Sequence, residues 1–248
     1  MGSTPDASLG ILDGAVIGLS LPLIRIGANG DANEASCWIL FSVVPAVTLH
    51  SLDRGEKQVL TEHIRSRDEL LLAVSSGLRP NYLFFWGHKP LPNGEIGKSC
   101  FSQWWPAEFL IGDASYPTAE HFMMAEKARL FMDEESRAQI LKAGSPKAAK
   151  QLGRQVKGFD QRIWEEARFR LVVEGNLAKF SQNNGLGEFL LETNEKVLVE
   201  ASPMDRIWGI GMAASNAQAE HPEQWRGLNL LGFALMEVRH RLGEGHSD

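Results

Sequence analysis

Hydrophobic and polar positions divide the chain into two parts after residue 79. In the first part, two short apolar and β-branched runs, residues 14–27 and 36–52, flank the turn-rich segment ANGDANEA and predict a β-hairpin or small sheet. Residues 67–77 predict a short helix that ends at its final glycine. We therefore expect residues 1–79 to form a small, β-containing N-terminal extension, and no residue pattern in it indicates a function.

Beyond residue 80, apolar positions recur at helical spacing between recognisable helix ends. Thr118 is the predicted N-cap of one helix, and Asp160 is the predicted N-cap of a long helix from about residue 161 to 180. Between these two, Ser145 followed by a proline begins a helix that Gly153 ends. The second part of the chain is therefore expected to be rich in helices.

The remaining elements complete the predicted domain. The last helix spans roughly residues 229–242, where leucine, alanine and valine recur at helical spacing, so one of its faces must be buried. The runs NYLFFWGH and KVLVEA predict short strands, and FSQWWPAEFLIGDASYPT predicts a mainly extended segment. We predict a mainly α (α+β) fold, a compact helical domain with a few short strands over residues 80–243, followed by a tail at 244–248.

Composition and charge narrow the classes of function. The 248 residues are 44% hydrophobic and 23% charged, which is typical of a folded protein large enough to be an enzyme. The formal net charge of −6, with no block of lysine and arginine, indicates no general attraction to duplex nucleic acid, although a short nucleotide remains open as a partner.

The cysteines and the apolar N-terminal stretch bear on location. Cys37 and Cys100 lie too far apart to indicate a disulfide framework or a zinc site. The apolar residues 9–26 are interrupted by Asp13, Pro22 and Arg25, so they predict neither a signal peptide nor a membrane span. We expect an intracellular protein, cytoplasmic or nuclear, without a membrane partner.

Candidate chemistry begins on the helix that Thr118 caps. Glu120 and Lys127 share one helix face with two large apolar residues, Met124 and Phe131. One interpretation is structural: Glu120 is a first-turn acid favoured by the helix dipole, and Lys127 extends from a partly buried surface. The other is functional: Glu120 is a general acid/base or cation-stabilising carboxylate, and Lys127 is an amine that binds a phosphate or attacks a sugar aldehyde. Periodicity leaves both open.

Three further residues are equally ambiguous from the pattern. In SPMDRIWGIG, Asp205 either lies at a pocket mouth or caps a turn, and Trp208 either lines that pocket or belongs to the core. Trp164 has the register of a core residue, yet a tryptophan can also stack on a flat base. His121 follows a glutamate without the His-Glu-x-x-His spacing, so no metal site is predicted.

The order of the motifs adds information that periodicity lacks. The second part of the chain resembles the YbiA-like, or NADAR (NAD and ADP-ribose associated), family of N-glycosidases over about residues 82–242. The resemblance rests on the following segments in this order: FSQWWPAEF, YPTAEHFMMAEKA, ILKAGSPKAAKQLGR, FDQRIWEEARFRLV, KFSQN, LLET, LVEASPMDRIWGIG and GLNLLGFALMEVRHRL.

The resemblance implies an activity and a set of site residues. Family members hydrolyse the bond between a ribose anomeric carbon and a heterocycle nitrogen, either in ribosylamino-pyrimidine phosphates of the riboflavin pathway or in ADP-ribose attached to guanine. The family's functional positions fall on Glu120, Lys127 and Asp205 as catalytic residues, with no metal or organic cofactor required. The positions implied to bind substrate are Trp164, Trp208, Ser102, Trp104, His121, Arg154, Gly209 and Asn229.

The chemistry of this bond assigns the roles. Cleavage gives the ribose oxocarbenium character, which a carboxylate near C1′ stabilises, so Glu120 is expected on the ribose side. Asp205 is expected to manage the proton or the water, while Trp164 and Trp208 wall the pocket. Lys127 is expected either to bind a phosphate or to form a Schiff base with the opened sugar.

Departures from the riboflavin-pathway pattern shift the expected substrate. The long segment FFWGHKPLPNGEIGKSC, the WGIG sequence and the 79 preceding residues favour ADP-ribose on guanine, in a nucleoside or in single-stranded nucleic acid. The acidic balance favours the small riboflavin intermediates instead, because it gives no attraction to a nucleic-acid backbone. A module that binds ADP-ribose or a nucleotide without turnover is the third alternative.

Overall fold

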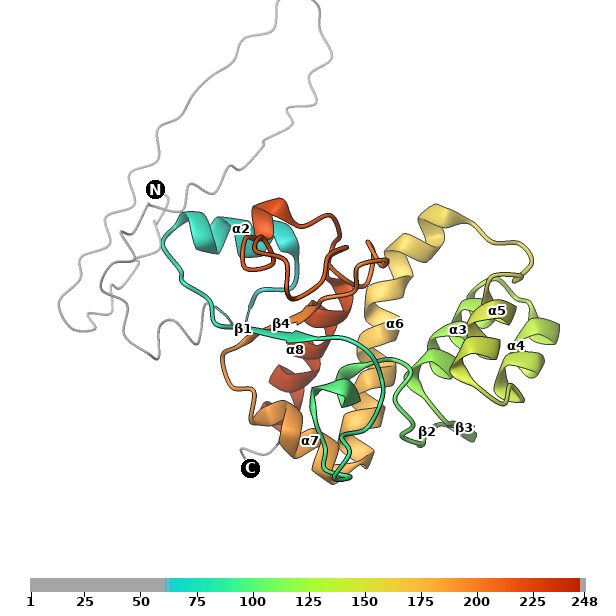
Figure 1. Ribbon diagram of the computed structural model, residues 1–248. Helices are drawn as coiled ribbons and strands as arrows, with labels where there is room; N and C mark the ends of the chain where they lie inside the picture. Colours follow the sequence, from blue (N-terminus) through green and yellow to red (C-terminus); the bar gives the residue numbers. More distant parts are fainter. Residues whose placement is uncertain (1–60, 62, 246–248) are drawn as a thin grey trace, which may run out of the picture. The chain divides into compact units, whose positions relative to one another are not determined.

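The computed structural model describes residue 61 and residues 63–245 (Figure 1). All of them belong to the second of two compact units, Pro45–Asp248, and the hairpin predicted before residue 53 lies outside the described residues. The described elements, in chain order, are α2 (Arg67–Ser75), β1 (Tyr82–Phe85), the 3₁₀ helix η2 (Lys98–Phe101), β2 (Phe109–Ile111), β3 (Ala114–Tyr116), α3 (Ala119–Leu130), α4 (Glu134–Leu141), α5 (Pro146–Gly153), α6 (Gln161–Gln182), α7 (Asn184–Leu191), β4 (Val197–Glu200), η3 (Pro222–Gln224) and α8 (Leu230–Glu244). The fold is mainly helical with a few short strands, as predicted.

The helix ends follow from side-chain caps that the sequence displays. The side chains of Thr118, Ser145 and Asp160 each accept a hydrogen bond from the backbone N–H three residues ahead, at the starts of α3, α5 and α6. Pro146 occupies the first turn of α5, where a missing N–H costs nothing. The predicted starts of these three helices are confirmed.

Two helices and one aromatic segment differ from the elements predicted from the sequence. The helices α4 and α7 were not predicted as separate elements; each is only 8 residues long, and α4 carries a weak apolar period. The aromatic segment expected to be mainly extended is a strand only at its end, where β2 and β3 pair antiparallel with Phe109 opposite Tyr116. Its first residues belong to η2 and the turn after it.

The sheet that positions the site has two strands far apart in sequence. β1 pairs in parallel with β4, and Phe85 lies opposite Glu200 at the carboxyl ends of both strands. In parallel strands the carboxyl ends meet at one edge, and ligand sites in open α/β sheets lie outside that edge. The residues that follow Phe85 and Glu200 are therefore brought to the same place.

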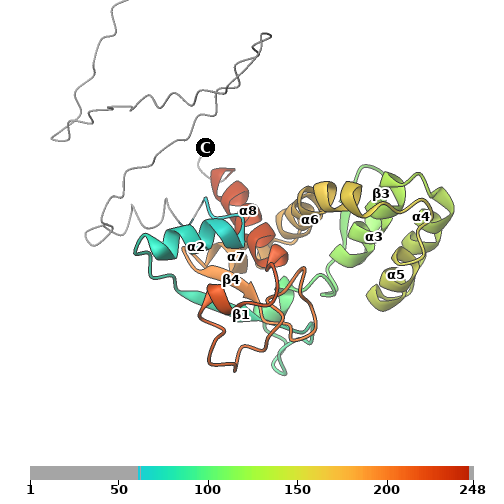
Figure 2. The ribbon, with the colours of Figure 1, turned by 90° about the horizontal axis from the view of Figure 1, so that it is seen from above.

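Helix α6 lies between two groups of elements. Figures 1 and 2 show α3, α4 and α5 on one side of it, and β1, β4 and α8 on the other. Contacts of α6 with α3 and with α8 join the two groups around one apolar core. Within the part of the chain described here, no helix is both long and apolar enough to cross a membrane.

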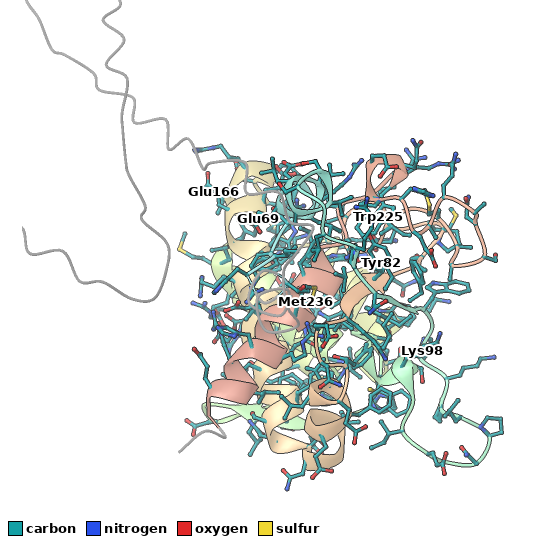
Figure 3. The ribbon with its side chains drawn as sticks, turned by 90° about the vertical axis from the view of Figure 1, so that its left-hand side faces the viewer. Glu69, Tyr82, Lys98, Glu166, Trp225 and Met236 are labelled. Atoms are coloured by element: carbon teal, nitrogen blue, oxygen red, sulfur yellow. The ribbon has the colours of Figure 1, made fainter. Side chains whose placement is uncertain are left out.

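The compact unit begins before the boundary predicted at residue 80. Leu70 of α2 and Leu78 are buried in the same core as β4, and Arg67 donates hydrogen bonds to the Pro222 and Glu223 carbonyls. Figure 3 shows this face, where Tyr82 and Trp225 are neighbours whose rings meet edge to face at 6.2 Å. Residues 64–79 thus pack as part of the domain rather than as a separate extension.

Candidate active site

Three regions of the chain converge on one cluster of charged and aromatic side chains. They are the first turn of α3, the carboxyl end of β4 with the loop after it, and the turn after η2. The carboxylates of Glu120, Glu200 and Asp205 influence one another electrostatically, and Lys150 of α5 acts on the first two. We refer to these three carboxylates as the carboxylate cluster.

Glu120 is a buried acid with an unusual environment. The residue is only 2% exposed, and its Oε1 atom has no hydrogen-bond partner in the described part of the chain. Its backbone N–H donates to the Gln103 carbonyl at 2.9 Å, which fixes the first turn of α3 to the turn after η2. Burial raises the pKa of Glu120 to about 7, against the lowering effects of Lys150, a hydrogen bond from Trp104, and Arg154. Glu120 can therefore exchange a proton near neutral pH.

Glu200 is the member of the cluster that the sequence analysis missed. It is the last residue of β4, its Oε2 atom is buried without a hydrogen-bond partner among the described residues, and its pKa is raised to about 8 by burial and then by Asp205. A polar residue ending an apolar strand is a signal for such a position. The signal gains meaning only when β1 and β4 are known to pair.

Asp205 organises the loop that follows β4. Its Oδ1 atom accepts hydrogen bonds from the backbone N–H groups of Ile207 at 2.9 Å and Trp208 at 2.7 Å. Gly209 comes so close to the end of β4 that an added Cβ would lie 2.7 Å from the Glu200 carbonyl oxygen. Asp205 thus caps the turn, and it also acts electrostatically on Glu120 and Glu200.

Trp104 and its supports form one side of the cluster. Trp104 donates a hydrogen bond to Glu120, and its ring lies 5.4 Å from that of His88, which follows β1. Ser102 holds the turn, because its Oγ accepts from the Trp104 N–H at 3.1 Å and its carbonyl accepts from the buried Lys179 amine at 3.0 Å. Ser102 thereby positions the tryptophan.

Helix α5 supplies positive charge to the cluster. Lys150 and Arg154 lie one turn apart, and both lower the pKa of Glu120. Among the described residues neither side chain forms an ion pair with a carboxylate, and the Lys150 amine lies 5.9 Å from the centre of the Trp104 ring. These cations are available to an anionic ligand.

Lys127 lies in a second cluster on the same face of α3. It is two turns beyond Glu120, about 10 Å along the helix axis. Its amine donates to the Gly153 carbonyl at 2.8 Å, lies 4.1 Å from the Phe159 ring centre and 5.8 Å from that of Trp164, and has a pKa lowered by burial. Phe159, 42% exposed, is a further aromatic residue that the sequence analysis did not single out.

Two further predicted binding residues, His121 and Asn229, have side chains that the protein itself engages. His121 is buried with Nε2 3.0 Å from the Ala143 carbonyl, which only accepts, so Nδ1 accepts from the Thr118 hydroxyl at 2.8 Å. Asn229 is fully buried; its Nδ2 donates to the Leu198 carbonyl, and its Oδ1 accepts from the Glu200 N–H. Both side chains are engaged by the protein itself, His121 at the start of α3 and Asn229 at the end of β4.

The carboxylate cluster contains the groups that acid/base chemistry requires. No three His, Cys, Asp or Glu side chains among those residues are arranged to hold a metal ion. Glu120 and Glu200 have raised pKa values, and they lie next to Asp205, which accepts two backbone N–H groups. In such a cluster one carboxyl can donate a proton while another accepts one. Cleavage of a glycosidic bond uses one carboxyl group as the acid and another as the base or nucleophile.

Comparison with known proteins also indicates glycosidic-bond cleavage. The model of the NADAR domain family matches residues 84–243. An N-glycosidase of Acanthamoeba polyphaga mimivirus is 44% identical over 163 residues, which cover 64% of this chain and 94% of the viral protein. N-glycosidase YbiA of Escherichia coli (strain K12) is 32% identical over 138 residues, which cover 56% of this chain and 76% of YbiA.

A solved structure supports the match. The NMR structure of the E. coli protein YbiA aligns with a TM-score of 0.52 at 26% identity, covering 68% of this chain and 88% of YbiA. The resemblance that the motifs indicated is therefore confirmed. Several of the similar proteins are named N-glycosidases, which are hydrolases of N-glycosyl bonds. This chain belongs to the NADAR domain family.

Proposed function

We propose that this N-glycosidase removes ADP-ribose from ADP-ribosylated guanine, in a nucleoside or in single-stranded nucleic acid. The observation that carries the proposal is the pair of cations on α5, Lys150 and Arg154, beside the buried Glu120. Two cations one helical turn apart suit the diphosphate of ADP-ribose, which carries more charge than a single ribose phosphate.

The carboxylate cluster supplies the chemistry under this proposal. Glu120, when ionised, stabilises the cationic ribose and takes a proton from the attacking water. Trp104 holds that carboxylate by its hydrogen bond, and Asp205 fixes the loop that carries Trp208. The partly buried Trp208 and the exposed Phe159 offer flat surfaces for a base, while Trp164 is 9% exposed and belongs to the core.

The test of the proposal is direct. The protein is incubated with a guanine-ADP-ribosylated oligonucleotide, with ADP-ribosyl-guanosine and with a ribosylamino-pyrimidine phosphate, and free ADP-ribose or ribose phosphate is followed by chromatography. We expect release of ADP-ribose from the first two. Turnover of the pyrimidine phosphate alone would select the riboflavin-type activity, and binding without any turnover would indicate a reader module.

The riboflavin-type activity is retained as a second candidate because of one observation. The net charge of −6 gives the chain no general attraction to a polyanion, so a small phosphorylated substrate is favoured over a nucleic acid. Comparing the oligonucleotide with the free nucleoside measures this effect. A much lower kcat/KM on the oligonucleotide would place the physiological substrate among small molecules.

Neutralising the cations of α5 should weaken substrate binding. We expect Lys150→Met and Arg154→Met each to raise KM for ADP-ribosyl-guanosine roughly tenfold or more, because each removes a charge-assisted contact to phosphate. Lys150→Met should also move the acidic limb of the kcat/KM profile to higher pH, because Lys150 lowers the pKa of Glu120. Lys147→Met is the matched control, since Lys147 is an exposed residue of the same helix; an equal effect there would refute a specific phosphate site.

Lys127 is the residue whose proposed role has two forms. With Schiff-base formation, we expect borohydride reduction during turnover to add the mass of the sugar to the peptide containing Lys127, and Lys127→Arg to abolish the adduct. The lowered pKa of this amine favours its neutral, nucleophilic form. No adduct, with KM raised in Lys127→Met, would leave Lys127 as a cation that binds phosphate.

A further inference from the structure

Glu200 is a half-buried residue with one fully buried carboxyl oxygen that no hydrogen bond satisfies within the described residues. Buried polar atoms are nearly always hydrogen-bonded, yet Glu200 Oε2 has no partner in the described part of the chain. An unpaired buried carboxyl destabilises a fold, and such groups concentrate at functional sites. The residue therefore requires an explanation that its place in β4 does not give.

The backbone around Glu200 is held on both sides. Its N–H donates to Asn229 Oδ1 at 2.9 Å, and its carbonyl accepts from the Ile210 N–H at 2.9 Å. Asn229 itself has a left-handed backbone with φ of 56°, a conformation that asparagine tolerates better than most residues. These contacts fix the end of β4, from which the Glu200 side chain meets the carboxylate cluster.

The charged groups that face Glu200 come from three elements. Asp205 of the following loop and Glu120 of α3 raise its pKa after burial itself, while Lys150 of α5 lowers it. Glu120 has Lys150, Arg154 and the Trp104 hydrogen bond to favour its ionised form. Two cations and an indole N–H thus favour the ionised form of Glu120, whereas two carboxylates face Glu200 and favour its protonated form.

We propose that Glu200 is the general acid that protonates the departing base, an assignment that rests on the proposed N-glycosidase function. The C1′–N bond breaks with its electron pair moving to the base nitrogen, which takes the Glu200 proton. Water oxygen bonds to C1′, and its released proton passes to the Glu120 carboxylate. After the reaction Glu200 is ionised and Glu120 is protonated. Proton exchange with solvent then returns both residues to their starting states.

The test compares two leaving groups. Glu200→Gln preserves shape but cannot donate an acidic proton, so kcat should fall roughly 10²- to 10⁴-fold on ADP-ribosyl-guanosine. On the 7-methylguanine analogue, whose base already carries positive charge and leaves without protonation, we expect the loss to shrink below roughly tenfold. Glu120→Gln should lose activity on both substrates. Equal losses of Glu200→Gln on both would overturn the assignment.

A second measurement separates failure of this inference from failure of the proposed substrate. The infrared difference spectrum of wild type minus Glu200→Gln at pH 7 should show the carbonyl stretch of a protonated carboxyl, whichever substrate the enzyme takes. Its absence in a folded variant would overturn the assignment without any turnover assay. If the wild type cleaves only the pyrimidine phosphate, the leaving-group comparison is made with a nitro-substituted pyrimidine, and equal losses again overturn it.

Discussion

Replacing Glu120 by glutamine should lower kcat on ADP-ribosylated guanine at least about 10³-fold while the protein stays folded. The carboxylate is buried at 2% exposure with Oε1 unpaired, so it has no structural hydrogen bond there for the amide to break. The variant loses both the negative charge beside the cationic ribose and the acceptor for the water proton. Release of free ADP-ribose, measured by chromatography under saturating substrate, checks the loss.

A control on the same helix separates chemistry from folding. Glu126 is also buried in α3, but it pairs with Arg129 at 2.7 Å, and it has no electrostatic link to the carboxylate cluster. Glu126→Gln should lower the melting temperature slightly and leave kcat within about twofold, since the pair is partly exposed and of small value. Activity retained in Glu120→Gln would show that the buried acid is not the catalytic carboxylate.

Local signals made much of the helical fold predictable from the sequence. Thr118, Ser145 and Asp160 cap their helices through bonds that span three residues, so nearby sequence is sufficient to place them. The pairing of β1 with β4 joins residues more than a hundred positions apart. No local pattern encodes such a contact, and the edge that assembles the site therefore appears only in the structure.

Some residues of the candidate site could be predicted from local sequence, and others could not. Glu120 and Asp205 stand in recognisable motifs, and the structure places both in the carboxylate cluster. The sequence shows Glu200 only as the polar end of an apolar strand, and the charges of Asp205 and of Glu120 on α3 act on it only in the folded chain. His121 adjoins Glu120 in the sequence, but neighbours on a helix point about 100° apart, and its ring contacts the Ala143 carbonyl instead.

Glu120 and Glu200, whose carboxyl groups each have a buried oxygen, should give the stability of the protein an unusual dependence on pH. Their folded pKa values are about 7 for Glu120 and about 8 for Glu200, whereas an unfolded glutamate titrates near pH 4.3. Between these limits the folded state holds protons that the unfolded state has released. The contribution of these two groups to stability must therefore fall as pH rises from about 4.5 to about 8, and level off above that range.

The double variant Glu120→Gln/Glu200→Gln isolates this effect. Each pKa unit corresponds to about 1.4 kcal/mol of unfolding free energy. After allowance for their mutual coupling, ionisation of the two glutamates lowers the stability of wild type at high pH by on the order of 4 kcal/mol, or roughly 10 °C in Tm. We expect the double variant to melt at nearly the same temperature as wild type at pH 5, and roughly 10 °C higher at pH 8.5. Calorimetry across this range checks the difference.

Other titrating groups do not produce the same difference. Asp133 has a pKa lowered to about 2 by its hydrogen bonds at the start of α4, so it titrates below the measured range, and His121 is present in both proteins. Parallel curves for wild type and double variant would mean that water reaches both carboxyls. A divergence confined to pH 5–8.5 would instead show that the fold gives up stability to keep two protonated acids at the end of β4 and the start of α3, as an enzyme that transfers protons near neutral pH requires.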